Sequence, residues 1–68
     1  MDRIVTKIKK LREERGLTQV DVANAVGVNY RTIGQYERGV NEPDIATIKK
    51  LCDFFDVSAD YLLGLKEY

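Results

Sequence analysis

Apolar residues recur along most of the chain three or four positions apart, which is the spacing of one helical face. Ile4, Ile8 and Leu11, followed by Arg15, mark such a face in the first segment, which Gly16 ends. No segment alternates apolar and polar residues for more than three or four positions, so no strand is predicted. The pattern predicts an all-α fold of five short helices, at residues 2–15, 18–26, 29–38, 44–55 and 58–63.

Polar residues predict where four of these helices begin. Thr18 is a good N-cap, and Asp21 three residues later resembles the second half of a capping box. The N-caps expected for the three following helices are Asn29, Asp44 and Ser58.

The second and third helices are separated only by Gly27 and Val28. A glycine at this corner can adopt a positive φ at little cost, which allows a sharp turn. Ala23, one turn earlier, has a small side chain that lets the two helices approach closely. The residues expected to face their shared core are Val22, Val26, Ile33 and Tyr36.

The C-terminal half is expected to complete the core. The residues of the fourth helix predicted to face inward are Ile45, Ile48, Leu51 or Cys52, and Phe55. The further residues assigned to packing are Phe54, Leu62 and Leu63.

Composition excludes most site chemistry. The chain has one cysteine, Cys52, and no histidine, so it can form neither an internal disulfide nor a Cys/His zinc site. Cys52 lies among apolar residues, which favours a buried structural thiol over a nucleophile. The commonest general base is also missing, and we expect neither an enzyme nor a cofactor.

The 68 residues suit one domain, residues 1–68, with no room for a ligand-sensing domain. We therefore expect no small-molecule ligand. No apolar run reaches the roughly 20 residues of a membrane span, and the N-terminus lacks a signal-peptide core, so we expect a cytoplasmic protein. Net charge is zero, but residues 1–16 carry six basic and three acidic side chains. A local patch, rather than the total, decides binding to nucleic acid.

The stretch LTQVDVANAVGVNYRTIGQYERG resembles the helix-turn-helix of the phage-repressor class, the Cro/cI or xenobiotic-response-element family. The matching features are Gln19 opening the second helix, Val22-Ala23, Gly27 and Ile33. The flanking segments LREERGLTQ and PDIATIKKLCDFFDVSADYLLG also match, so the resemblance covers residues 4–64. It implies a compact domain with the motif at about 18–38, whose third helix enters the major groove of double-stranded DNA.

The outer face of the third helix carries side chains suited to reading bases. Arg31 can grip guanine bidentately and Gln35 can grip adenine, with Tyr30 beside them. Gly34, placed on the same face, would either let a base edge approach the backbone or serve no such role. Each of these residues alone is equally typical of a solvated surface, and the tight helix pair is what favours groove contact.

The resemblance also implies contacts to DNA phosphates and a structural ion pair. Arg12 is implied to pair with Glu37 and so join the first and third helices; the alternative is two separate exposed charges. The implied phosphate contacts are Gln19, Arg12, Thr32, Arg38 and Asn41.

We expect a transcriptional repressor that binds a near-palindromic operator as a homodimer. Tyr61, Leu65 and Tyr68 have little core left to join, so they form either the dimer interface or a frayed tail. The competing hypothesis is an antitoxin or adaptor that uses the fold mainly to bind a protein. The acidic residues Glu42 and Asp44, and the zero net charge, favour that alternative.

Overall fold

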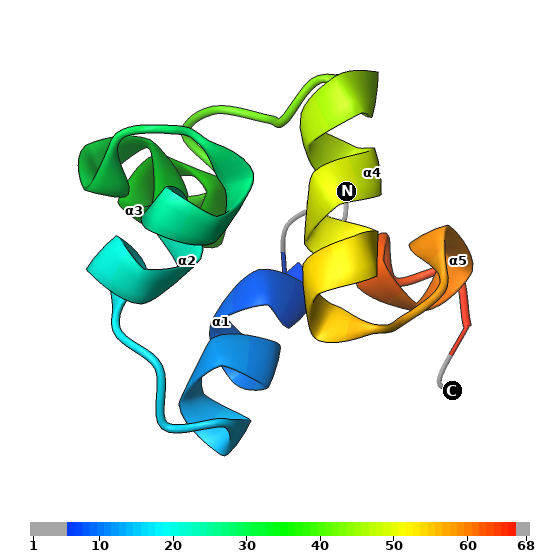
Figure 1. Ribbon diagram of the computed structural model, residues 1–68. Helices are drawn as coiled ribbons and strands as arrows, with labels where there is room; N and C mark the ends of the chain where they lie inside the picture. The colour runs from blue at the N-terminus through cyan, green and yellow to red at the C-terminus, as the bar shows by residue number, and fades with distance from the viewer. Residues whose placement is uncertain (1–5, 67–68) are drawn as a thin grey trace.

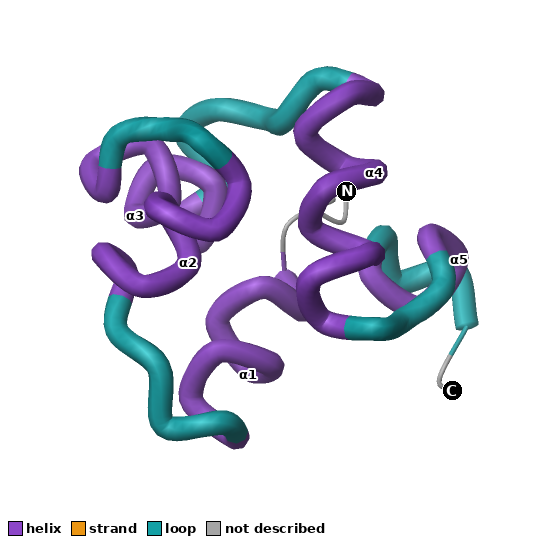
Figure 2. The backbone as a smooth tube through the Cα atoms, in the orientation of Figure 1, coloured by secondary structure: helices purple, strands orange, loops and turns teal. Residues whose placement is uncertain are grey.

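The computed structural model describes residues 6–66, which form five helices and no strand (Figures 1 and 2). Residues 2–5 of the predicted first helix lie outside the described residues. Between residues 6 and 66, every helix is too short or too polar to cross a bilayer. The helices are α1 (Thr6–Glu14), α2 (Gln19–Val26), α3 (Tyr30–Arg38), α4 (Ile45–Phe55) and α5 (Ala59–Leu62).

The predicted N-caps are present and begin four of the helices. The Thr18 hydroxyl accepts from the Asp21 N–H at 3.0 Å, and the Thr18 N–H donates to Asp21 Oδ2 at 2.9 Å, which completes the capping box. Asn29, Asp44 and Ser58 each accept a backbone N–H of the first turn that follows. These bonds satisfy N–H groups that a helix leaves unpaired at its start, so the helix boundaries follow from local sequence.

The corner between α2 and α3 is built as expected. Gly27 is left-handed, with φ of 74°, and its N–H donates to the Ala23 carbonyl at 2.8 Å. The two helices pack against each other on the left of Figure 1, and α4 and α5 lie on the right. Inner residues of all five helices join one core, whose buried members are Ile8, Leu11, Val22, Ala23, Val26, Ile33, Tyr36, Leu51, Phe55 and Leu62.

Two residues predicted to be buried are exposed. Ile45 is 75% exposed and Phe54 is 38% exposed. The buried positions before and along α4 recur every four residues, so Ile45 and Phe54 fall on its outer side. Those buried positions are Pro43, Thr47, Leu51 and Phe55.

A polar residue, Thr47, takes the inward place that Ile45 was expected to fill. Its backbone N–H donates to the Asp44 cap at 2.8 Å, and its side chain shares a hydrogen bond with Tyr36. Burial nevertheless raises the pKa of the Tyr36 hydroxyl. This inward position is polar, so hydrophobic spacing does not reveal it.

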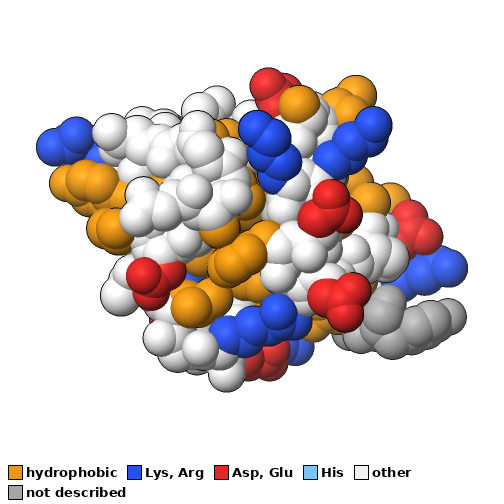
Figure 3. Space-filling model, in the orientation of Figure 1, with side chains coloured by type: hydrophobic (Ala, Val, Ile, Leu, Met, Phe, Trp, Pro, Cys, Tyr) orange, Lys and Arg blue, Asp and Glu red, His pale blue; other side chains and the backbone are white. Residues whose placement is uncertain are grey.

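The remaining packing predictions hold in part. Leu63 and Cys52 are half-buried, and Cys52 packs against the core. Burial raises the pKa of the Cys52 thiol, which favours its unreactive protonated form. Figure 3 shows one face of the molecule, where basic and acidic groups lie interspersed and form no patch of a single sign.

Candidate nucleic-acid interface

The outer side of α3 presents an aromatic ring and a guanidinium as one unit. Tyr30 is 44% exposed, and Arg31 beside it is exposed. The Arg31 guanidinium lies over the Tyr30 ring, 5.0 Å from its centroid. Asn29 accepts the Arg31 backbone N–H at 2.8 Å and so fixes this first turn of the helix. Thr32 and Gln35, also on α3, are half-buried.

A bidentate ion pair joins α1 to α3. Arg12 Nε donates to Glu37 Oε2 at 2.7 Å, and Arg12 Nη2 donates to Glu37 Oε1 at 3.1 Å. The two side chains are 14% and 4% exposed. The hydrogen bond with Glu37 raises the pKa of Arg12, which keeps the guanidinium charged. The implied pair is therefore present, and it is largely removed from solvent.

Arg12 is committed to the interior of the motif. Its Nη1 donates to the carbonyl of Leu17 at 3.0 Å, just before α2 begins. Three of the five N–H donors of a guanidinium are thus engaged within the protein. The observed role of Arg12 is to connect α1, the approach to α2, and α3.

Gln19 belongs to the same network. Its Nε2 donates to Glu37 Oε1 at 3.1 Å, so one carboxylate binds side chains from both α1 and α2. Gln19 is half-buried at the first position of α2. Its amide is therefore oriented by Glu37 within the protein itself.

Gly34 is buried, so the expectation that it lies on the exposed face is wrong. A Cβ at this position would lie 3.1 Å from Arg38 Nη1 and 3.4 Å from Gln19 Nε2. Those two side chains cover Gly34. The exposed face of α3 therefore consists of side chains, with no bare backbone at its centre.

The loop after α3 is tied back to the helix. The N–H groups of Val40 and Asn41 donate to the Gln35 carbonyl at 3.0 and 3.4 Å. The Asn41 side chain is exposed and accepts the Glu42 N–H at 3.1 Å. At the far end of the loop, a backbone hydrogen bond from the first turn of α4 lowers the pKa of Asp44. The lowered pKa favours the ionised carboxylate of Asp44, which follows the implied phosphate contact Asn41 by three residues.

Comparison with known proteins agrees with this geometry. The family model described as Helix-turn-helix matches residues 8–62. The chain belongs to this helix-turn-helix family. The match confirms the resemblance to Cro/cI-type regulators, a family of DNA-binding transcriptional regulators.

Two curated relatives of the helix-turn-helix chain are regulators. Over 62 residues it is 44% identical to the cryptic phage CTXphi transcriptional repressor RstR of Vibrio cholerae, covering 91% of this chain and 56% of RstR. Over 61 residues it is 36% identical to the HTH-type transcriptional regulator ImmR of Bacillus subtilis (strain 168), covering 90% of this chain and 48% of ImmR. The chain thus spans about half the length of these relatives.

A solved structure shares the whole helix-turn-helix domain. The P22 c2 repressor in complex with a synthetic operator matches with a TM-score of 0.88 and 27% identity. The match covers 97% of this chain and 100% of the P22 chain, and it confirms the predicted all-α fold.

Two exposed apolar residues, one within the helix-turn-helix and one just after it, were not singled out from sequence. Val20, beside Gln19 in α2, is 48% exposed, and Val40, after α3, is 69% exposed. In the sequence, the feature that could have pointed to them is that each stands next to a polar residue assigned to phosphate contact, Gln19 or Asn41.

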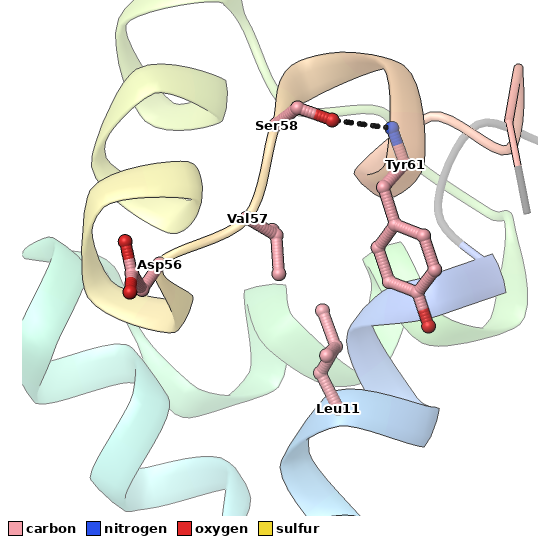
Figure 4. Close-up of a pocket in the computed structure, with 5 residues that line it drawn as sticks. All are labelled: Leu11, Asp56, Val57, Ser58 and Tyr61. Carbon is pink, nitrogen blue, oxygen red and sulfur yellow. Dashed lines mark hydrogen bonds between the residues drawn. The ribbon is translucent and has the colours of Figure 1, made fainter. Parts of the chain in front are cut away.

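The structure also contains a hollow away from the helix-turn-helix. It has a volume of about 420 Å³ and lies between α1 and the segment around α5 (Figure 4). None of its lining residues belongs to α2 or α3. Within residues 6–66, no three His, Cys, Asp or Glu side chains are grouped to hold a metal ion. The lining residues are Leu11, Asp56, Val57, Ser58 and Tyr61.

Proposed function

We propose that this chain is a sequence-specific DNA-binding transcriptional repressor whose α3 enters the major groove. The observation that carries the proposal is that Tyr30 and Arg31 are exposed together on α3. The same helix is held to α1 by the ion pair between its Glu37 and Arg12. The complex of the P22 c2 repressor with a synthetic operator supports it, because the two chains match over nearly their full length.

Two side chains of α3 read bases in this proposal. Arg31 grips guanine O6 and N7, and Gln35 grips adenine N6 and N7, because each presents two groups at the required spacing. Tyr30 packs beside Arg31 and contacts a thymine methyl or a phosphate. An α-helix with its side chains is about 10–12 Å across, which suits a major groove about 12 Å wide.

Phosphate contacts hold the domain in register. Gln19, at the N-terminus of α2, lies where unpaired N–H groups and the helix dipole favour an anion. The loop after α3 carries Glu42 and Asp44 and no lysine, so few cations face the phosphates there. Affinity should therefore fall only shallowly with salt. The remaining phosphate contacts in the proposal are Thr32, Arg38, Asn41 and Arg12, the last through the two N–H donors that its three hydrogen bonds within the protein leave over.

The proposed repressor acts as a homodimer on two related half-sites. Its Cα positions span only 26 × 23 × 21 Å, whereas half-sites one helical turn apart are separated by about 34 Å. One copy is therefore too small to read both. Leu65 is 71% exposed and available for an interface, whereas Tyr61 is half-buried against the core. Tyr68, the third predicted interface residue, lies outside the described residues.

The second candidate is an antitoxin or adaptor that binds mainly a protein partner. Zero net charge and the exposed acidic residues Glu42 and Asp44 favour it. Either protein would work in the cytoplasm, where its DNA or protein partner is found.

Selection of bound sequences from a random DNA pool separates the two candidates. The repressor should enrich one motif, present twice with inverted symmetry, and should shift it in a gel more strongly than random DNA. An adaptor should enrich no motif above the starting pool.

A further inference from the structure

Gly34 lies inside a helix, and its backbone conformation does not require a glycine. The chain has five glycines, and the other four adopt a positive φ. Those four lie at corners or helix ends, where a side chain would be strained. Gly34 lies in the middle of α3, where glycine is less favourable than alanine. The structural effect of glycine here is therefore the space left by the missing side chain.

Two polar side chains from different helices fill that room. A Cβ on residue 34 would lie 3.1 Å from Arg38 Nη1, 3.4 Å from Gln19 Nε2 and 3.7 Å from Gln19 Oε1. Arg38 ends α3, and Gln19 begins α2. The missing side chain thus lets a guanidinium and an amide converge on one spot of α3.

One of these side chains is already held by the buried network. Gln19 Nε2 donates to Glu37 Oε1 at 3.1 Å, and Glu37 is paired with Arg12. The Gln19 amide is therefore fixed, whereas Arg38 is exposed and can be displaced. A side chain at residue 34 would push the Arg38 guanidinium outward and away from Gln19.

We propose that Gly34 is a positioning residue that lets Gln19 and Arg38 form one joint donor surface for a backbone phosphate of DNA. This inference rests on the proposed function. A guanidinium donates charge-assisted hydrogen bonds, and the adjoining amide and the α2 N-terminus add donors for the same anion. Gly34 itself touches no DNA; it acts through the two side chains that cover it.

The first test needs no DNA. Gly34→Ala should keep the fold and raise the Tm slightly, because alanine favours helix. The Gln19 side-chain amide and Arg38 Nε resonances in a nitrogen–proton NMR spectrum should shift. Asn24→Ala, a change at an exposed residue of α2, is the control and should leave both resonances in place. Unchanged resonances in Gly34→Ala would overturn the inference.

The second test is a binding cycle on the selected operator. Gly34→Ala should weaken binding about fivefold and reduce the salt slope by up to about one unit, as loss of a phosphate contact does. In a Gln19→Ala/Arg38→Ala background, the same change should have almost no effect. An equal loss in both backgrounds would mean that Gly34 contacts DNA itself, and an unchanged affinity would remove its role; either result overturns the inference.

The two tests separate the inference from the proposed function. If the unmodified chain binds no DNA sequence, the repressor proposal fails, and the NMR result still decides whether Gly34 positions Gln19 and Arg38. If Gly34→Ala does not fold, the same change is made together with Arg38→Ala, which removes the nearest neighbour. Failure of that variant to fold would show that the core restricts residue 34, which contradicts the inference.

Discussion

Arg12 of α1 and Glu37 of α3 face each other with Nε 2.7 Å from Oε2, and Gln19 of α2 donates to the same carboxylate. A single acidic side chain thus joins three helices. Because the Glu37 side chain is 4% exposed, its charge is stabilised by these partners rather than by water.

Glu37→Ala should destabilise the fold strongly. It leaves the Arg12 guanidinium without its carboxylate, and breaking a desolvated pair from one side costs about 3–5 kcal/mol. Denaturant unfolding of Glu37→Ala, Arg12→Ala and the double variant measures the coupling between the two residues. The double variant should be less destabilised than the sum of the single variants. Strict additivity would mean that the two charges act independently.

Tyr30 should assist Arg31 through its ring rather than its hydroxyl. The guanidinium lies 5.0 Å from the ring centroid, and an exposed contact of this kind contributes about 0.5–1 kcal/mol. Tyr30→Phe should therefore keep discrimination at the base pair read by Arg31, whereas Tyr30→Ala should reduce it about two- to fivefold. Fluorescence anisotropy with single-base operator variants measures both. Equal losses in the two variants would indicate that the hydroxyl makes the contact.

Asp44 should make stability depend on acid pH. Its folded pKa lies below the ordinary value of 3.8, because its carboxylate accepts the Thr47 N–H. The contribution of this cap is therefore present above the ordinary pKa and is lost as the pH falls through the lowered folded pKa. Asp44→Asn keeps a capping oxygen but should flatten this part of a profile of Tm against pH. An unchanged acid limb would assign the sensitivity to other carboxylates.

The sequence predicts local structure well where one residue decides it. Thr18 and Gly27 each set a helix end through their own side chain or backbone, and both behave as expected. Ile45 was misplaced because the inward position at the start of α4 is taken by Thr47, whose partner Tyr36 comes from another helix and is brought to it by the tertiary fold.

In the candidate site too, features set by one helix could be predicted from the sequence, whereas features set by contacts between helices could not. Tyr30 and Arg31 could be placed on the outer face of α3 from helical spacing alone. Gly34 could not, because its surroundings are made by Gln19 from another helix and by Arg38 folded over α3. Contacts between side chains of different helices become visible only when the helices are placed in space.

Leu65 should contribute to self-association. Its side chain is 71% exposed, but its N–H donates to the Asp60 carbonyl at 2.8 Å, so its backbone closes α5. Leu65→Ser keeps that bond while removing the apolar side chain, and it should shift sedimentation toward the monomer without lowering the Tm. Ile45→Ser, at a strongly exposed apolar side chain on α4, is the matched control. An unchanged dimer in Leu65→Ser would place the interface elsewhere.

The outer face of α3 as a reader of bases is tested most directly by the affinity of Arg31→Ala for a panel of single-base operator variants, at two salt concentrations. Loss of a bidentate base contact should cost about 1–3 kcal/mol and relax preference at one base pair of each half-site. Gln35→Ala should do the same at a different base pair, whereas Arg38→Ala should weaken all sequences alike and reduce the salt slope by about one unit. If Arg31→Ala still discriminates between base pairs at every operator position as well as the unmodified chain does, the assignment is contradicted. This face of α3 would then contact phosphates or a protein partner instead.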